Sequence, residues 1–304
     1  MSRKIVISFD FELGWGVLDS ELWRIRENSD LYENLRPVFG QLMHVLNETE
    51  IQTTWAIVSS LLVESESELD IEHLPSSYKN DVVSFYRNSK ASTRCGLDLV
   101  DSLQLNMPLI EIASHTSTHI YAKQKDVKAC QYVSDVKKSI STLEYYFNQK
   151  IETLIFPRDQ SDFNNEIASY RPLNFRLNPR YGLNMSTIFR VASGVSRVYS
   201  SPPSSRVILG SYGELYQTGS LYFNWLGGKY EYFKKILVKM QASRVLSITN
   251  KSSICHIWLH PFNLAESKEH FDLFVTFLHS LSRLRDKGVV EVVTMKDISE
   301  LHKM

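Results

Sequence analysis

The 304-residue chain has few cysteines, no net charge and no long hydrophobic run, and each absence excludes a class of protein. Its three cysteines, Cys95, Cys130 and Cys255, are odd in number and widely spaced, so we expect neither a disulfide framework nor a Cys-x-x-Cys metal site. Buried, reduced thiols are the simplest interpretation. Lysine plus arginine equals aspartate plus glutamate at 34 each, and no basic run stands out, which argues against a nucleic-acid partner.

The apolar runs are also too short for a secreted or membrane-spanning chain. Residues 5–9 follow two basic residues but end at Asp10, so they are too short for the core of a signal peptide. No later segment approaches the roughly 18 apolar residues that a membrane span needs. We therefore expect a cytoplasmic protein without membrane insertion, and 43% hydrophobic residues are ample for a folded core.

Strand-like and helix-like patterns alternate along the chain. Short apolar, β-branched runs predict strands at 4–9, 53–58, 109–113, 151–156, 254–259 and 289–294. Apolar residues three and four apart predict helices at 33–47, 126–148, 267–286 and from 295 onward. We expect one domain over 1–304, with an irregular, partly helical insertion near 64–108 and elaborations near 175–250. The order predicts a parallel α/β sheet, open or closed into a barrel, with the active site at the carboxyl ends of the strands.

Two histidines four residues apart follow the third predicted strand, in His115-Thr-Ser-Thr-His119. This spacing allows both imidazoles to reach one metal ion if the segment turns after the strand. Two unrelated polar loop residues are the alternative. A metalloprotease of the His-Glu-x-x-His type is disfavoured, because Thr116 stands where the catalytic glutamate would be.

A pair of carboxylates, Asp10 and Glu12, ends the first predicted strand. Alternate residues of an extended segment share a face, so both side chains can point at one site. A buried carboxylate is costly unless it is paired or ligated, although Asp10 could also simply cap the following turn. We assign Asp10 as a general base and Glu12 as the third metal ligand, beside His115 and His119.

These residues resemble the motifs of the polysaccharide deacetylase family, the NodB-homology group or carbohydrate esterase family 4. The motifs that carry the resemblance occur in the family's order over about residues 4–300, and they are Ser8-Phe9-Asp10, His115-x-x-x-His119, Phe156-Pro157-Arg158 and Leu259-His260. The resemblance implies an α/β fold of the distorted (β/α) barrel type, with parallel strands and outer helices. It also implies metal-dependent hydrolysis of N-acetyl groups on sugars, with His260 as the acid that protonates the leaving amine.

The chain departs from the family's motifs at three places. The family's first motif has two adjacent aspartates, whereas Phe11 follows Asp10 here, so the resemblance is to a branch with an Asp-x-Glu motif. The third motif is altered around Arg158, which we expect either to hold Asp10 in a bidentate contact or to form an unrelated salt bridge. The fourth motif, an Asp-Trp pair, is not found, and Trp225 is a candidate without an adjacent aspartate.

Aromatic and polar residues beside these motifs are candidates for contact with the substrate. Trp15 and Trp23 are close in sequence to Glu12, and Asp159 and Gln160 follow Arg158. Further aromatic residues crowd 212–232, where one or two could line a groove while the others pack in the core. His256 shares a strand face with Trp258 and His260, and is expected to be a core histidine.

The leading functional hypothesis is a hydrolase that uses one divalent metal ion, zinc in the first place, although the same ligands also accept cobalt, nickel or iron. Its expected substrate is an N-acetylated amino sugar in surface-polysaccharide biosynthesis, either small or linked to a carrier. Two alternatives stay open. One is a deformylase or cyclic-amide hydrolase on the same scaffold, and the other is a carbohydrate-binding protein without activity.

Overall fold

The computed structural model describes residues 3–105, 107–171, 173–177, 204–228, 230–247 and 254–303. Part of the elaboration expected near 175–250 falls on 178–203, 229 and 248–253, which lie outside the described residues. The strands are β1 (Arg3–Phe11), β2 (Thr53–Ile57), β3 (Ile110–Ser114), β4 (Thr153–Ile155), β5 (Asn174–Leu177), β6 (Val207–Leu209), β7 (Leu215–Thr218), β8 (Leu221–Tyr222), β9 (Ile254–Leu259) and β10 (Val290–Val292).

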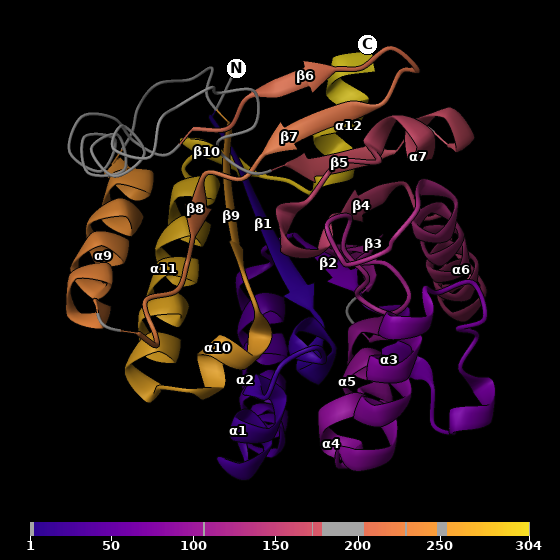
Figure 1. The fold of residues 1–304 in the computed structure, drawn as a ribbon. Helices are drawn as coiled ribbons and strands as arrows, with labels where there is room; N and C mark the ends of the chain where they lie inside the picture. The colour runs from indigo at the N-terminus through magenta and orange to yellow at the C-terminus, as the bar shows by residue number, and fades with distance from the viewer. Residues whose placement is uncertain are drawn as a thin grey trace.

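Helices surround these strands (Figure 1). The α-helices are α1 (Leu22–Asn28), α2 (Leu31–Thr49), α3 (Ser76–Asn88), α4 (Ala91–Arg94), α5 (Leu97–Gln104), α6 (Ala129–Phe147), α7 (Asn164–Tyr170), α9 (Glu231–Ser247), α10 (Pro261–Ala265), α11 (Lys268–Asp286) and α12 (Met295–Lys303). The 3-10 helices are η1 (Leu13–Val17), η2 (Ser59–Leu62), η3 (Glu66–Glu68), η4 (Met107–Leu109) and η5 (Pro157–Asp159). None of the helices in the described ranges is both long enough and apolar enough to cross a membrane.

The strands form one sheet in the order β6-β7-β5-β4-β3-β2-β1-β9-β8, with β10 beside the first residues of β1. Every pairing is parallel except that between β6 and β7, which is antiparallel. Parallel neighbours need a crossover connection, which the helices between the strands provide. All the predicted strands and helices are present, with their ends within three residues of the predicted positions.

The sheet curls round until its two sides meet at a single extended segment. β7 pairs with β5 and β8 pairs with β9, yet only two residues separate β7 from β8. Between them the N–H of Gly219 donates to the Leu177 carbonyl at 3.1 Å, and the N–H of Ser220 donates to the His256 carbonyl at 2.8 Å. A side chain at Gly219 would crowd Trp258, because a Cβ atom would lie 3.1 Å from its Nε1. The predicted distorted barrel is therefore confirmed.

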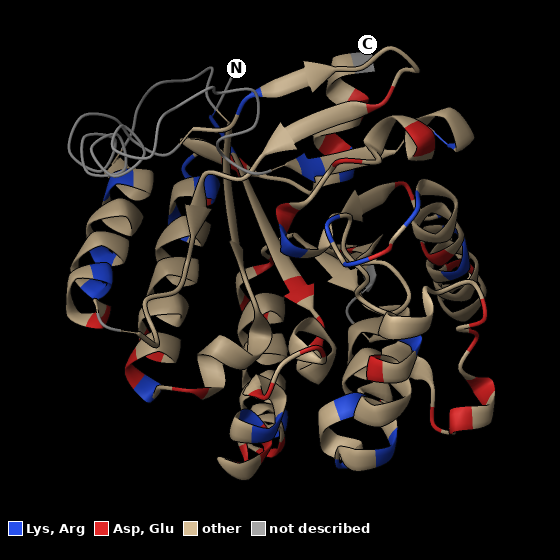
Figure 2. Cartoon of the chain, in the orientation of Figure 1, with Lys and Arg blue, Asp and Glu red and all other residues tan. Residues whose placement is uncertain are grey.

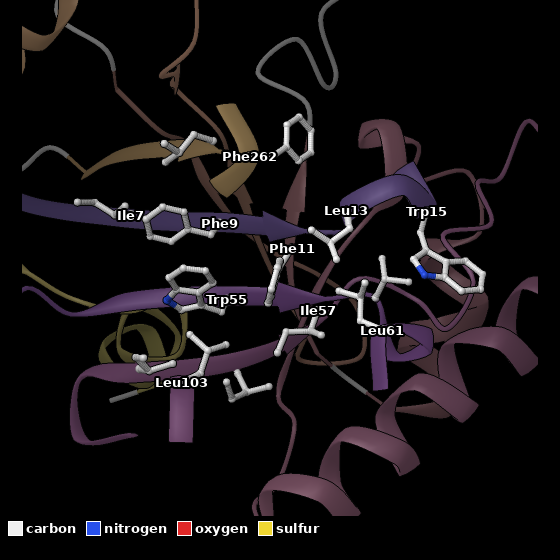
Figure 3. Close-up of a cluster of buried hydrophobic side chains, with 14 of the residues drawn as sticks. Ile7, Phe9, Phe11, Leu13, Trp15, Trp55, Ile57, Leu61, Leu103 and Phe262 are labelled. Carbon is white, nitrogen blue, oxygen red and sulfur yellow. The ribbon is translucent and has the colours of Figure 1, made fainter. Parts of the chain in front are cut away.

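The outer face of the sheet forms the main hydrophobic core. Along β1, Ile5, Ile7, Phe9 and Phe11 lie on this face, and all are buried. Phe9 stacks on Trp55 of β2 with 4.1 Å between ring centroids (Figure 3). The same rings contact Phe39 of α2 and Phe274 of α11. Burial of each such aromatic side chain contributes on the order of 2 kcal/mol to folding, so this core fixes the register of β1.

The alternate residues of β1 face the inside of the barrel and change from apolar to polar along the strand. Val6 packs with Met295 and Ile298 of α12, which close the end of the barrel where the strands begin. Ser8 and Asp10 follow on the same face. Because side chains alternate along a strand, the register that buries Phe9 outside necessarily places Asp10 inside. The polar end of the barrel is therefore the end where the strands finish.

Candidate active site

A cleft of about 730 Å³ opens at the carboxyl ends of the strands. Asp10 and Glu12 line it from the end of β1, where Figure 2 shows acidic colouring at the tip of the strand arrow. His115, His119 and His260 line the same cleft. The structure thus brings together the five residues that the sequence analysis assigned to the metal site, the base and the acid. Their catalytic and ligand roles stay predictions.

Glu12, His115 and His119 converge on one point. Their candidate ligand atoms all lie within 4.8 Å of one another, and the three side chains are buried. Glu12 Oε2 lies 3.0 Å from His119 Nε2 and 3.4 Å from His115 Nε2. Two imidazole nitrogens and one carboxylate oxygen form the ligand set of a divalent-metal site that keeps a position open for water. The residues therefore fit the metal ion that the resemblance implies.

A hydrogen bond fixes which nitrogen of His115 is free to bind a metal. Its Nδ1 lies 2.8 Å from the carbonyl oxygen of Ile155, which can only accept, so Nδ1 carries the proton. The lone pair is then on Nε2, the atom that faces Glu12. An outer contact of this kind also fixes the orientation of the imidazole ring, as in many histidine metal sites.

Space for the Glu12 carboxylate is provided by a glycine in the next turn. Glu12 precedes η1, and a Cβ atom on Gly16 would lie 1.9 Å from Glu12 Oε1, far inside contact distance. Burial opposes ionisation of Glu12, but the His260 and His119 imidazoles outweigh it and hold its pKa well below the ordinary value. The residue is thus an anion in a buried position, as a metal ligand must be.

Asp10 is clamped by an arginine that the sequence analysis did not identify. The two guanidinium nitrogens of Arg176 each donate to one oxygen of Asp10 at 2.6 Å, in a buried bidentate pair. Burial opposes ionisation of Asp10, but the charge and hydrogen bonds of Arg176 outweigh it, so the pKa of Asp10 lies below its ordinary value. Arg176 also donates to Ser8 Oγ at 3.2 Å and lies over the Trp258 ring. Asp10 is therefore ionised and fixed in orientation.

The predicted contact between Arg158 and Asp10 is wrong. Arg158 has a left-handed backbone, with φ of 55°, and donates instead to Asp19 at 2.6 Å while lying over the Tyr121 ring. This is the salt-bridge alternative that the sequence left open. Arg158 still lines the cleft, as does Asp159, which lies 3.5 Å from Arg176. Gln160 accepts a hydrogen bond from the Lys123 N–H and does not line the cleft.

His260 has partners on both sides of its ring. Its Nε2 lies 3.4 Å from Glu12 Oε1. On the other side, Nδ1 lies 3.1 Å from the Tyr222 hydroxyl and 3.3 Å from Asn263 Oδ1. Tyr222 itself donates to Asn263 and stacks on Trp258 at 4.1 Å. On its Nδ1 side the imidazole is thus oriented by two neutral groups, while its Nε2 side faces the Glu12 carboxylate.

Trp225 does not take the place of the missing fourth motif. It is buried and packs on His270, with 4.2 Å between ring centroids. Among the described residues, Tyr222 and Asn263 occupy the position beside His260 instead. Tyr222 is also the member of the aromatic-rich stretch near 212–232 that lines the cleft and could contact a sugar.

The two tryptophans predicted to contact substrate lie in the core. Trp15 is completely buried against Phe85, and its Nε1 donates to the Arg94 carbonyl. Trp23 is 4% exposed and packs against the same phenylalanine. Neither lines the cleft. Their closeness to Glu12 in sequence misled the prediction, because η1 and α1 turn these side chains toward α3.

His256 is a core histidine, as expected. It is fully buried below the cleft, and its Nε2 lies 2.8 Å from Ser8 Oγ. Burial, with a smaller contribution from the positive charge of Arg176, lowers its pKa well below the ordinary value. His256 is therefore neutral in the native state.

Comparison with known proteins identifies the fold. No family model matches the chain, and no curated protein matches its sequence. Among solved structures, a protein assigned as a polysaccharide deacetylase from Mycobacterium smegmatis is 12% identical with a TM-score of 0.57, covering 98% of this chain and 89% of that one. A second such protein, from Pseudomonas aeruginosa PAO1, is 10% identical with a TM-score of 0.54, covering 98% and 90%.

The same architecture also occurs in enzymes with other activities. The α-amylase AmyC from Thermotoga maritima is 10% identical with a TM-score of 0.59, covering 99% of this chain and 75% of that one. The chain therefore has the distorted barrel fold that polysaccharide deacetylases share with this amylase. At such low identity the fold is what these similarities establish, so the activity must be argued from the site.

Proposed function

We propose that the protein is a metal-dependent hydrolase that removes an N-acyl group, acetyl in the first place, from an amino sugar in surface-polysaccharide biosynthesis, and that it acts in the cytoplasm. The observation that carries the proposal is the convergence of Glu12, His115 and His119 beside a clamped aspartate and an oriented histidine. Zinc is the proposed metal, and the resemblance to the deacetylase motifs supports the acyl group and the sugar.

The residues of the cleft divide the chemistry between them. A bound divalent metal ion would lower the pKa of a water molecule and polarise the acyl carbonyl. The Asp10 carboxylate is ionised and fixed by Arg176, so it can accept the proton of the attacking water. His260 presents Nε2 to the same space while Asn263 and Tyr222 hold Nδ1, so in its imidazolium form the ring can donate its Nε2 proton to the leaving amine and become neutral.

The cleft is suited to a small, polar substrate. Its volume of about 730 Å³ lies within the range of about 300–1,000 Å³ that is usual for small-molecule sites. Asn224, Asn263 and Tyr222 contribute hydrogen-bonding groups to its wall, and Arg158 and Asp159 contribute charges. Hydroxyl-rich sugars need such groups for orientation. These features support an amino-sugar unit, whether small or linked to a carrier.

The test combines metal analysis with an assay of the released acid. Purified protein is expected to contain or bind one divalent ion per chain, and the double variant His115→Ala/His119→Ala is expected to lose it. His44→Ala is the matched control, because His44 is exposed on α2. Release of acetate or formate is then measured over a panel of acylated amino sugars.

Each result of this test bears on one hypothesis. Acetate release supports the proposed activity, whereas formate release assigns the deformylase alternative. Metal binding without turnover on any member of the panel contradicts the proposed activity and favours a carbohydrate-binding protein. The absence of a bound ion, even with added zinc or cobalt, contradicts the metal site itself.

A further inference from the structure

The loop that carries the two candidate metal-binding histidines is held by a buried carboxylate on α6. Asp135 is fully buried. Its Oδ2 accepts hydrogen bonds from two consecutive backbone N–H groups, those of Ser117 at 2.8 Å and Thr118 at 3.1 Å. Its Oδ1 accepts from the Thr118 hydroxyl at 3.1 Å. One side chain thus fixes the central peptide groups between His115 and His119.

A fourth partner reaches Asp135 from the segment that precedes α3. His73 Nε2 lies 2.9 Å from Asp135 Oδ1, so the carboxylate joins the loop to the region that the sequence analysis described as an insertion. The insertion also contacts the loop directly, because the Tyr78 hydroxyl of α3 donates to the Thr118 carbonyl at 2.8 Å. The loop is therefore enclosed by α6 on one side and by the insertion on the other.

The loop requires this support because its backbone is strained at both ends. Thr116 has φ of 64° and His119 has φ of 60°, in the left-handed region that residues other than glycine rarely adopt. For the β-branched Thr116 the conformation is an outlier. Such strain persists only where the surrounding structure over-determines it. Asp135 supplies part of that structure, because it accepts three hydrogen bonds from two adjacent residues of the loop.

We propose that Asp135 is a positioning residue for the metal site: it holds the 115–119 loop in the strained conformation that aims His115 and His119 at one ion, and His73 couples the insertion to it. The inference rests on the proposed metal site but assigns Asp135 no contact with metal or substrate. Without the carboxylate, the loop can relax toward ordinary backbone angles, and the two imidazoles no longer converge.

The experiment measures the affinity of the metal-free protein for Co²⁺ from its visible absorption, in the wild type and in Asp135→Asn. Asparagine has the same shape but cannot accept all of these hydrogen bonds, because its amide nitrogen only donates. Loss of an outer contact of this kind typically weakens metal affinity about 10- to 100-fold, which is the expected result, together with an altered Co²⁺ spectrum.

Glu111→Gln is the matched control. Glu111 is a half-buried carboxylate that, like Asp135, accepts hydrogen bonds from threonine hydroxyl and backbone N–H groups, but it lies at the start of the strands, away from the cleft. We expect Glu111→Gln to lower the free energy of unfolding while Co²⁺ affinity stays within about twofold of the wild type. Thr118→Val, which removes one of the donors to Asp135, serves if Asp135→Asn does not fold, and is expected to weaken Co²⁺ binding by a smaller factor.

The outcomes separate this inference from the proposed function. Wild-type affinity in Asp135→Asn, or in Thr118→Val where the first variant does not fold, would overturn the positioning role. An equal loss of affinity in Glu111→Gln would also overturn it, since the effect would then be one of general stability. If the wild type itself binds no Co²⁺, the proposed metal site fails, and the positioning role fails with it.

Discussion

Arg176 is the residue on which several parts of the candidate site depend. Its guanidinium contacts Asp10, Ser8, Asp159 and the face of Trp258, and it is 1% exposed. A planar guanidinium can meet both oxygens of a carboxylate, whereas an ammonium group cannot. Its burial excludes water from the Asp10 pair, so the orientation of the carboxylate depends on this one side chain.

We expect Arg176→Lys to lower kcat by about 100-fold, because misplacement of a catalytic group by about 1 Å has a cost of that order. Metal affinity should change little, since Arg176 contacts none of the candidate ligands. Arg158→Lys is the control and should keep most of the activity, because Arg158 pairs with Asp19. Steady-state kinetics and metal titration provide the measurement, and a greater loss in Arg158→Lys would contradict this assignment.

A second substitution tests how His260, the proposed acid, is oriented. Tyr222→Phe removes the hydroxyl beside His260 Nδ1 and leaves the ring that stacks on Trp258. Because Asn263 still holds the imidazole, we expect kcat to fall by only about tenfold, less than the 100- to 10,000-fold that general acid–base catalysis contributes as a whole. KM should change less than kcat. An unchanged kcat would show that the hydroxyl does not orient His260.

At the scale of elements, the 3-10 helix η1 that follows β1 packs closely against the Glu12 carboxylate. η1 follows the strand, and its backbone passes so close to the Glu12 carboxylate that a Cβ atom at position 16 would lie 1.9 Å from Glu12 Oε1. The turn therefore confines a candidate metal ligand as well as ending the strand.

We expect Gly16→Ala to displace Glu12 and to weaken metal binding by at least tenfold. Gly40→Ala is the matched control, because a Cβ atom there would meet nothing within 4 Å and Gly40 lies inside α2. That control should raise the free energy of unfolding by about 0.5–1 kcal/mol, as alanine replaces glycine in a helix. Metal titration and chemical denaturation measure the two effects, and unchanged metal affinity in Gly16→Ala would contradict the first.

An element could be predicted where a short stretch of sequence carries a clear apolar pattern of its own. β1, β3 and β9 are apolar runs that end in a polar residue, so Asp10, His115 and His260 could be placed at strand ends without a structure. β5 is only four residues long and lies in a stretch without clear periodicity, so the inward-facing Arg176 was missed. Arg158 was chosen in its place, since the sequence carries no information about the left-handed backbone that turns its side chain toward Asp19.

At the scale of the whole molecule, the barrel encloses a histidine, His256, whose charged form is disfavoured by burial. The pKa of His256 is well below 6.5 because of burial and the nearby positive charge of Arg176, whereas in the unfolded chain it is about 6.5. The unfolded state therefore binds more protons below about pH 6.5. The stability that the neutral histidine contributes is fully present above that pH and is lost as the pH falls.

We expect this one group to lower the free energy of unfolding by about 1.4 kcal/mol per pH unit below about pH 6.5. His256→Gln keeps a polar side chain but does not titrate, so its stability should fall less steeply with acid. Denaturant titrations of metal-free wild type and variant between pH 7.5 and 5.5 give the two slopes. If the free energy of unfolding falls equally steeply with pH in both proteins, the prediction is wrong. His256 would then be protonated in the native protein, or would contribute nothing to the acid sensitivity of the protein.

During synthesis, the candidate metal ligands emerge before the residues proposed to orient the base and donate the proton. β1, β2 and β3 are both consecutive in the sequence and adjacent in the sheet, and the three candidate metal ligands all lie within the first 119 residues. Arg176 and His260 lie on or beside strands that are synthesised later. A growing chain thus presents all three candidate metal ligands well before Arg176, which orients Asp10, and His260, the proposed proton donor, is among the last residues to be synthesised.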